Sequence, residues 1–293
     1  MKDSSGGEAR ITVIGMATNF ALFALKLVAG ILGKSFALVA DAFHSLSDTA
    51  TDIVVLWSIK VSSRPPDANH RYGHKKIENL AELFIAVAIA AVAIRIAKGS
   101  IGGFFSKERH LPSWWVIFPL VVSIVAKEML YHSTLRVGKK QSSLPVVANA
   151  WHHRTDSISS LVILIGILIM ELFPSLYFLD AALGVAVAVF IIVLAAKIFL
   201  SGLKKLLDTS PPEEFYQAVE DFALGFPDIL SVHKLRMRYL GSKIAADMHI
   251  QVQPDMSVYN AHKIASRLEH ALLKRFPSLC EVLIHIEPFS PRE

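Results

Sequence analysis

The chain has 293 residues, 53% of them hydrophobic and 19% charged, and a mean hydropathy of +0.46. Soluble domains contain about 45–50% apolar and about 25% charged residues, so this composition excludes a disordered or collagen-like chain and indicates membrane segments. The single cysteine, Cys280, excludes an intramolecular disulfide and a thiolate metal cluster. In so hydrophobic a chain the net charge of +5 favours contact with a membrane surface over nucleic-acid binding.

Six hydrophobic segments are expected to cross a bilayer, because a membrane helix needs about 20 mostly apolar residues. They run over residues 11–33, 36–61, 77–101, 114–131, 147–173 and 176–200. The first segment is too long for a cleavable signal peptide, and further spans follow it. Trp114 and Trp115 at the start of the fourth segment are typical of a membrane interface.

Basic residues are concentrated in the connections after the second and fourth spans and directly after the sixth. They are Arg64, Arg71, Lys75, Lys76, Arg136, Lys139, Lys140, Lys204 and Lys205. The connection after the first span contains only Lys34, and the connection after the fifth contains no basic residue. The positive-inside rule therefore predicts that both termini lie in the cytoplasm.

A soluble domain at residues 209–293 is predicted to follow a transmembrane domain at residues 1–208. Helical periodicity covers residues 213–224 and 257–276, and strand-like patterns cover residues 232–239, 244–252 and 282–286. This order predicts a small α+β domain with its helices on one face of a sheet. So small a core often needs a metal or a partner for stability, so we expect a dimer.

Ionisable side chains occur inside two of the hydrophobic spans. The second span contains Asp41, His44, Asp48 and Asp52. A charged group at the bilayer centre costs about 2.5–3.5 kcal/mol on insertion scales, so these side chains are expected to face protein or water. His44 and Asp48 are four residues apart on one helix face, and His152 and Asp156 repeat this spacing in the fifth span.

Two such helices facing each other would supply two imidazole nitrogens and two carboxylate oxygens. This set completes a tetrahedral shell for a divalent ion such as zinc. The alternative is a pair of buried His–Asp hydrogen bonds that hold helices together, and the repeated spacing disfavours it. His153 competes with His152 for the ligand role. Asp41 and Asp52 remain open as proton carriers, partners of the ligands or helix contacts.

Three ordered motifs resemble those of the cation diffusion facilitator family. They are ADAFHSLSD at residues 40–48, PDANHRYGHKKIE at residues 66–78 and NAWHHRTDS at residues 149–157. The tail ending in LIHIEP at residues 283–288 extends the resemblance over nearly the whole chain. The resemblance implies six transmembrane helices, a cytoplasmic ferredoxin-like domain, and a homodimeric, proton-coupled exporter of divalent metals.

The resemblance also implies metal sites outside the membrane. Asp67, His70 and His74 correspond to a loop site of bacterial zinc-transporting members, and a solvated polar loop is the alternative. The tail site corresponds to residues that bind a bridged pair of metals at the family's dimer interface: His233, His249, His262, His285 and Glu287. Ile286 replaces a glutamine ligand of a zinc-transporting relative, which leaves that shell one ligand poorer. Exposed surface histidines are the alternative there.

One further pair is carried over from the family. Lys76 and Asp208 match an ion pair that links two protomers at the cytoplasmic face of the membrane. The predicted location is the inner (plasma) membrane, and the expected partners are divalent metals, protons, lipid and a second copy, without nucleic acid.

The predicted activity is secondary active transport, not enzyme catalysis. Zinc is expected both as substrate and as regulatory ligand, with cadmium, iron(II), cobalt, nickel and manganese as other substrates. Ligation requires neutral imidazole and ionised carboxylate, so protons compete with the metal and can be exchanged for it. A metal-sensing scaffold without transport is an alternative function. An intramembrane metalloenzyme is disfavoured, because the sequence has no His-Glu-x-x-His motif.

Overall fold

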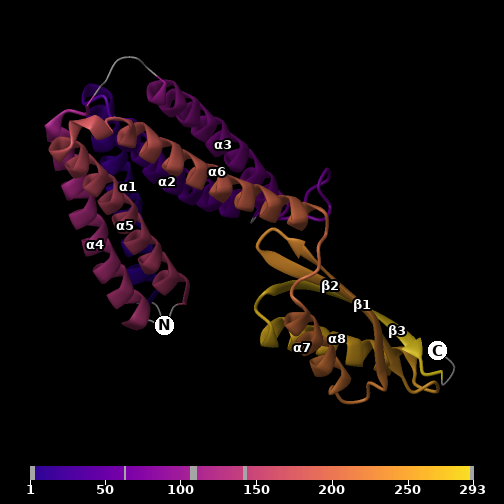
Figure 1. Cartoon of the computed structure of the whole chain (residues 1–293). Coiled ribbons are helices and arrows are strands. Elements are labelled where there is room, and N and C mark those ends of the chain that lie inside the picture. The colour runs from indigo at the N-terminus through magenta and orange to yellow at the C-terminus, as the bar shows by residue number, and fades with distance from the viewer. Residues whose placement is uncertain (1–3, 63, 106–110, 141–143, 291–293) are drawn as a thin grey trace. The chain divides into compact units, whose positions relative to one another are not determined.

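The computed structural model describes residues 4–62, 64–105, 111–140 and 144–290. Within these ranges six long helices come first (Figure 1): α1 Ser4–Leu32, α2 Phe36–Ser62, α3 Ile77–Phe104, α4 Ile117–Lys140, α5 Leu144–Leu172 and α6 Phe178–Leu206. Short 3-10 turns, η1 Trp114–Val116 and η2 Pro174–Leu176, precede α4 and α6. Helix α4 extends well past residue 131, where the fourth span was predicted to end.

Five segments of the described chain are long and apolar enough to cross a membrane. They are Arg10–Leu32, Ile77–Phe104, Trp114–Lys140, Val146–Leu172 and Pro174–Leu206. Helix α2 has 27 residues but lies outside this set, since it carries Asp41, Asp48 and Asp52. Asp41 and Asp48 are buried inside the protein, so lipid does not have to solvate them. The expected helical membrane domain is confirmed.

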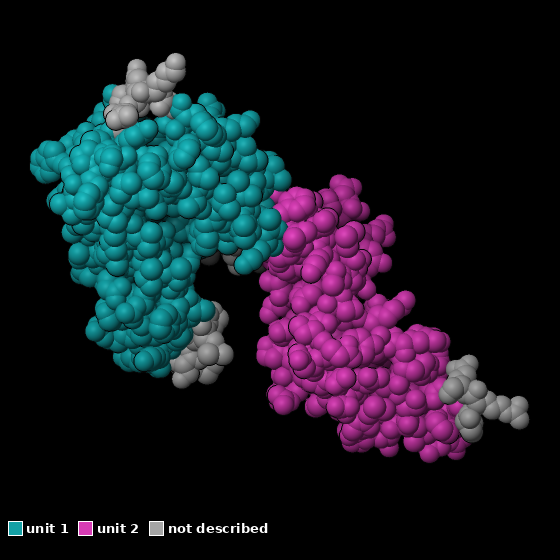
Figure 2. Space-filling model, viewed as in Figure 1, with its two compact units in different colours: residues 1–54, 84–198 teal, residues 55–83, 199–293 magenta. Residues whose placement is uncertain are grey.

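The chain forms two compact units (Figure 2). Unit 1 contains residues 1–54 and 84–198, and unit 2 contains residues 55–83 and 199–293. Unit 2 therefore includes the last part of α2, the first part of α3 and the last part of α6 together with the C-terminal elements. The predicted division after residue 208 stays a prediction.

Small and branched residues form the two apolar cores of unit 1. The first core joins α1, α2, α5 and the η1–α4 segment through Ala29, Ala37, Leu38, Val116, Leu120, Ile163, Ile167 and Met170. The second joins α3 to α6 through Ile89, Ala93, Ile191 and Ala195. Alanine at these positions lets helix backbones approach closely, which drives packing in lipid, where no hydrophobic effect operates between helices.

An aspartate from α6 fixes the start of α2. The Oδ1 atom of Asp180 accepts a 2.6 Å hydrogen bond from the Ser35 hydroxyl, and Oδ2 accepts one of 2.6 Å from the Phe36 N–H. A carboxylate at a helix N-terminus binds backbone N–H groups that have no partner within the helix. This buried cap holds the beginning of the helix that carries His44 and Asp48.

The C-terminal elements follow the predicted order. They are α7 Glu213–Leu224, β1 Ser231–Leu240, β2 Lys243–Val252, α8 Val258–Arg275 and β3 Leu279–Pro288. The sheet has the order β1-β2-β3, with β1 antiparallel and β3 parallel to β2. Because parallel strands need a crossover, α8 connects β2 to β3. The Ser257 hydroxyl caps α8 by accepting from the Asn260 N–H. The expected small α+β domain is confirmed.

The two faces of this sheet differ in composition. Alternate residues of β2, such as Ile244, Ala246 and Met248, join α7 and α8 in the core of the domain. The intervening residues of β2, including His249, point to the opposite face. A register shift between His233 and Arg236 in β1 marks a β-bulge. The helices cover one face and leave the other free for functional side chains.

Candidate functional site

Helices α2 and α5 bring the four predicted transport ligands together. The Nε2 atom of His44 is 3.4 Å from Oδ1 of Asp156, and Nε2 of His152 is 3.5 Å from Oδ1 of Asp48. Ligand atoms of His44, Asp48 and Asp156 all lie within 4.8 Å of one another. Each histidine thus faces a carboxylate of the other helix, as two matching four-residue spacings allow.

A cavity of about 160 Å³ borders this group, and Leu194 and Ile198 of α6 form its apolar wall. Its polar lining residues are Asn19, Asp48, Thr51, Asp52, Asn149, His152 and His153. His44 and Asp156 are buried, whereas the side chain of His152 is 42% exposed. Asp48 and His152 are therefore the ligands that an ion in this cavity would meet first.

A buried lysine lies next to the ligands. Lys127 of α4 is fully buried, and its Nζ is 2.6 Å from Oδ2 of Asp156. The ammonium group occupies one carboxylate oxygen and leaves Oδ1, which has no hydrogen-bond partner among the described residues, on the His44 side. Sequence reasoning missed this residue, although a lysine inside an apolar span was the signal.

A second buried lysine explains the position of Asp41. The Nζ atom of Lys26, on α1, is 2.8 Å from Oδ2 of Asp41. The Ser160 hydroxyl of α5 donates to the same oxygen at 2.9 Å, and Lys26 also donates to Ser45 and Ser160. Asp41 therefore connects three helices. It lies outside the clustered ligand atoms.

His153 is not part of the ligand group, although it is adjacent to His152. Its buried ring lies against α1, where a Cβ placed on Gly15 would be 3.5 Å from the His153 Nε2 atom. Neither ring nitrogen has a hydrogen-bond partner among the described residues. Of the two histidines, His152 faces Asp48 across the site. Asp52 lines the cavity together with His153.

The loop before α3 brings Asp67, His70 and His74 together. Nδ1 of His70 is 3.2 Å from Oδ1 of Asp67, and Nε2 of His74 is 3.3 Å from Oδ2. Hydrogen bonds to Oδ1 from the His70 N–H, and from the Asn69 N–H, lower the pKa of Asp67 below its ordinary value. The carboxylate is therefore ionised at neutral pH and available to a cation.

The open face of the C-terminal sheet carries a row of three histidines. His233 pairs with His249 across β1 and β2, and His249 pairs with His285 across β2 and β3. Glu287 contacts all three: its Oε2 is 3.0 Å from His233 Nε2, and its Oε1 is 2.8 Å from His249 Nδ1 and 3.6 Å from His285 Nε2. The hydrogen bond from His249 lowers the pKa of Glu287 below its ordinary value.

The remaining predicted tail residues lie elsewhere. His262 is exposed on α8, and the core face of that helix packs on the other side of the sheet. Within one chain it therefore does not join the row of histidines. Ile286 packs against the apolar core, because strand alternation turns it away from His285 and Glu287. A ligand at position 286 would point away from this open face.

Lys76 and Asp208 lie close together within one chain. Nζ of Lys76 is 3.0 Å from Oδ1 of Asp208. Lys76 precedes α3 and Asp208 follows α6, and a 2.8 Å ion pair between Glu82 and Lys205 also joins these two helices. Adjacent helix ends therefore bring the two charges together within one chain, and the predicted link between protomers stays a prediction. So exposed a pair contributes about 0–1 kcal/mol.

Glu78, at the start of α3, connects three segments of unit 2. Its Oε1 accepts a hydrogen bond from the Ser62 hydroxyl at the end of α2, and its Oε2 accepts one of 2.7 Å from the Ser242 N–H in the β1–β2 turn. Gly241 has a φ of +63°, and a Cβ there would lie 2.6 Å from the Glu78 Oε2 atom. Only glycine combines this backbone conformation with so close an approach.

Family models match almost all of the chain. The cation efflux transmembrane domain matches residues 12–207, and the cytoplasmic domain of cation efflux proteins matches residues 211–289. The chain belongs to the cation diffusion facilitator family. As a member of this family it is a multi-pass membrane protein that exports metal cations, and it is a transporter and not an enzyme.

Curated relatives of this cation diffusion facilitator align over nearly its full length. An uncharacterized transporter of Methanocaldococcus jannaschii is 32% identical over 94% of this chain and 96% of its own. The manganese efflux system protein MneP of Bacillus subtilis is 28% identical over 96% of each chain. Metal tolerance protein C1 of Arabidopsis thaliana is 32% identical over 98% of this chain and 64% of its own.

Proposed function

We propose that this cation diffusion facilitator exports zinc in exchange for protons. It works as a homodimer in the inner (plasma) membrane, with both termini in the cytoplasm and the substrate site exposed alternately to the two sides. The observation that carries the proposal is the convergence of His44, Asp48, His152 and Asp156 from two facing helices.

The donor set favours zinc. Lys127 occupies Oδ2 of Asp156, so this carboxylate offers one oxygen, Oδ1, to the site. Asp48 offers Oδ1 toward His152. With one nitrogen from each histidine, the site supplies two nitrogens and two oxygens, which is a tetrahedral zinc shell. Manganese prefers more oxygen ligands in an octahedral arrangement, so this site fits manganese less well than zinc.

The charges of the site suggest how protons are coupled to the metal. In their ionised forms Asp48, Asp52 and Asp156 carry three negative charges, and Lys127 carries one positive charge. One divalent cation balances the remaining two charges, and so do two protons held by His44 and His152. Metal and protons therefore replace each other at the same nitrogens. An inward proton gradient then drives the metal out.

The cavity beside Asp48 supports a route by which ions reach the ligands in one of the two alternating states of the transporter. Its volume of about 160 Å³ accommodates a partly hydrated ion, and polar side chains line it on α1, α2 and α5. His152 borders the cavity, so a metal ion in the cavity can reach its imidazole without any further movement of the helices. Closing this cavity and opening the opposite side would complete the transport cycle.

Flux measurements in proteoliposomes test the proposal. With an inward proton gradient, we expect zinc to leave the compartment that the protons enter, with about two protons exchanged for each zinc ion. Manganese flux is expected to be at least about tenfold slower. Faster manganese than zinc flux would assign the site to manganese. Zinc flux that is independent of the proton gradient would contradict proton coupling. Metal binding without any flux would favour the sensing scaffold.

The exposed clusters are proposed as accessory metal sites. Asp67, His70 and His74 form a cation-attracting loop, and the sheet cluster of His233, His249, His285 and Glu287 binds a regulatory zinc. In this proposal, zinc on the sheet cluster draws the two C-terminal domains of the dimer together. The open face of the sheet supports it, because ligands there can be shared with a second copy.

Substitutions of two tail histidines test the sheet site. His249→Ala removes the central member of the cluster, so zinc affinity of the tail is expected to fall at least about tenfold, which corresponds to about 1.4 kcal/mol. His262→Ala is the matched control, because His262 is exposed on α8 outside the cluster. Calorimetric titration of the full-length protein, with the transport site removed by His44→Ala, measures both affinities. An equal loss in the two variants would show that the site includes His262 of a second copy.

A further inference from the structure

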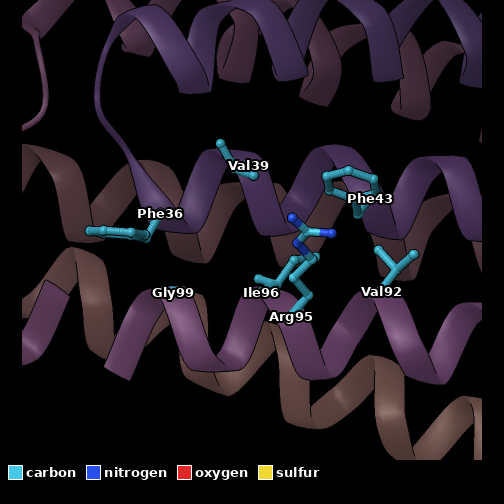
Figure 3. A pocket seen from close by; sticks show the side chains of 7 residues that line it. All are labelled: Phe36, Val39, Phe43, Val92, Arg95, Ile96 and Gly99. Atoms are coloured by element: carbon cyan, nitrogen blue, oxygen red, sulfur yellow. The ribbon is translucent and has the colours of Figure 1, made fainter. Parts of the chain in front are cut away.

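Figure 3 shows an apolar groove between α2 and α3. The cavity has a volume of about 510 Å³. Phe36, Val39 and Phe43 line it from α2, and Val92 and Ile96 line it from α3. These side chains suit a hydrocarbon chain, and both helices belong to the membrane domain.

Arg95 is the charged residue of this groove. Its guanidinium extends from α3 toward α2 and lies between Val39 and Phe43 (Figure 3). No hydrogen bond or ion pair joins it to any described residue, although the most apolar 18-residue stretch of α3 has a mean hydropathy of 2.3. An arginine inside a membrane helix is costly unless an anion accompanies it, so Arg95 requires a partner from outside the described fold.

A second cation borders the same groove. Lys34, in the turn between α1 and α2, lines an adjoining cavity of about 320 Å³ that shares Phe36 and Val39 with the first. No acidic side chain lines either cavity in the described chain. Asp180, which caps α2 nearby, is buried and already accepts hydrogen bonds from Ser35, Phe36 and Ala37. The two positive charges therefore remain unbalanced.

The guanidinium of Arg95 can reach the level of the lipid headgroups. It precedes the end of α3, at Phe104, by nine residues, or about 14 Å of helix. A 28-residue helix is about 42 Å long and extends about 6 Å beyond each side of a hydrocarbon layer of about 30 Å. The long arginine side chain thus comes close to the phosphates of that leaflet, while its stem stays among apolar groups.

We propose that this groove binds an anionic phospholipid. One acyl chain lies against Phe36, Phe43 and Ile96, and the phosphate lies between Arg95 and Lys34. Two cations without a lining acid favour a headgroup with net negative charge over a zwitterionic one, which brings its own cation. A protein partner would have to bring a carboxylate to this depth. The groove ends at Phe43, next to the ligand His44, so the lipid touches a helix of the transport site.

Native mass spectrometry of the full-length protein tests this site. The probes are phosphatidylglycerol and phosphatidylcholine with identical chains, in equal amounts. Wild-type protein is expected to retain phosphatidylglycerol at least about tenfold better. The double variant Arg95→Gln/Lys34→Gln is expected to lose this preference, and Arg95→Lys to keep most of it. Lys98→Gln is the matched control: Lys98 is exposed on the same helix but outside the groove, so the preference should be unchanged.

Three results would overturn the proposal. The first is an unchanged lipid preference in the double variant, and the second is an equal loss in Lys98→Gln, which would show a diffuse charge effect. The third is efficient cross-linking between two copies through Val92→Cys in a Cys280→Ser background, which would place a second protomer in the groove. Circular dichroism of each variant establishes that its helices are intact. Since the readout is lipid retention, failure here leaves the proposed zinc–proton exchange untouched.

Discussion

Replacing Asp156 with asparagine is expected to abolish zinc transport and to destabilise the membrane domain at the same time. The substitution removes the carboxylate that faces His44, and it leaves the ammonium of the buried Lys127 without its partner at 2.6 Å. Breaking a buried ion pair from one side costs about 3–5 kcal/mol. Loss of a ligand is expected to reduce flux by about a hundredfold or more, the equivalent of about 2.8 kcal/mol. Proteoliposome flux and thermal unfolding measure the two effects.

A double variant separates the two roles of Asp156. Asp156→Leu combined with Lys127→Met replaces both buried charges by apolar groups, which is often neutral for stability. We expect this variant to regain stability and to remain inactive. If Asp156→Asn transported zinc at the wild-type rate, Asp156 would not be a ligand. If the double variant recovered transport, Asp156 would serve only as a counter-charge for Lys127.

The second large effect is expected at the pair of Lys26 and Asp41. Lys26→Met leaves the buried Asp41 carboxylate with the Ser160 hydroxyl as its remaining partner, so the stability of the membrane domain should fall by about 3–5 kcal/mol. Thermal unfolding in detergent measures the loss. Lys98→Met is the control, because Lys98 is an exposed lysine of a membrane helix and forms no ion pair with a described residue.

The corresponding double variant distinguishes a helix contact from a proton carrier. Lys26→Met with Asp41→Leu removes both charges and is expected to restore stability together with zinc–proton exchange. This outcome follows if Asp41 only connects α1, α2 and α5. A stable double variant that moves zinc without protons would instead assign proton transfer to Asp41. The proton-to-zinc ratio in proteoliposomes is the deciding measurement.

Much of the fold was predictable because its signals are local. The prediction of a helix at residues 213–224 coincides with α7, since an acidic first turn and an apolar stripe define both ends. The two strands around Gly241 were predicted from alternation, which the β-bulge interrupts in β1, and β1 and β2 extend the predicted ranges by no more than one residue at any end. The last strand was predicted too short, because β3 continues at both ends through residues that pairing with β2 holds in the sheet.

The proximity of the four proposed transport ligands was predictable for a similar reason. A four-residue spacing fixes which side chains share a helix face, and the repetition of His-x-x-x-Asp on α2 and α5 is visible in the chain itself. The partners of these residues were not visible. Lys26 and Lys127 lie on α1 and α4, and only the packing of four helices shows which carboxylate each one meets.

In the tail, a single chain tests the calls carried by family resemblance only in part. It grouped His262 with three strand histidines; within one chain α8 packs on the other side of the sheet, so a role for His262 at a dimer interface stays a prediction. It also paired Lys76 with Asp208, which the adjacent ends of α3 and α6 bring together in one chain, and the predicted link between protomers stays a prediction. Strand alternation, in contrast, explains directly why Ile286 lies in the core.

The carboxylate of Glu78 has a mechanical consequence. Because it bonds to the end of α2 and to the β1–β2 turn at once, a tilt of the C-terminal sheet would be passed to α2 and α3 through a single side chain. Glu78→Asp shortens that side chain by one methylene. The sheet and the helices would keep their structures but would no longer move together. Zinc binding to the C-terminal domain would then no longer change the rate of transport.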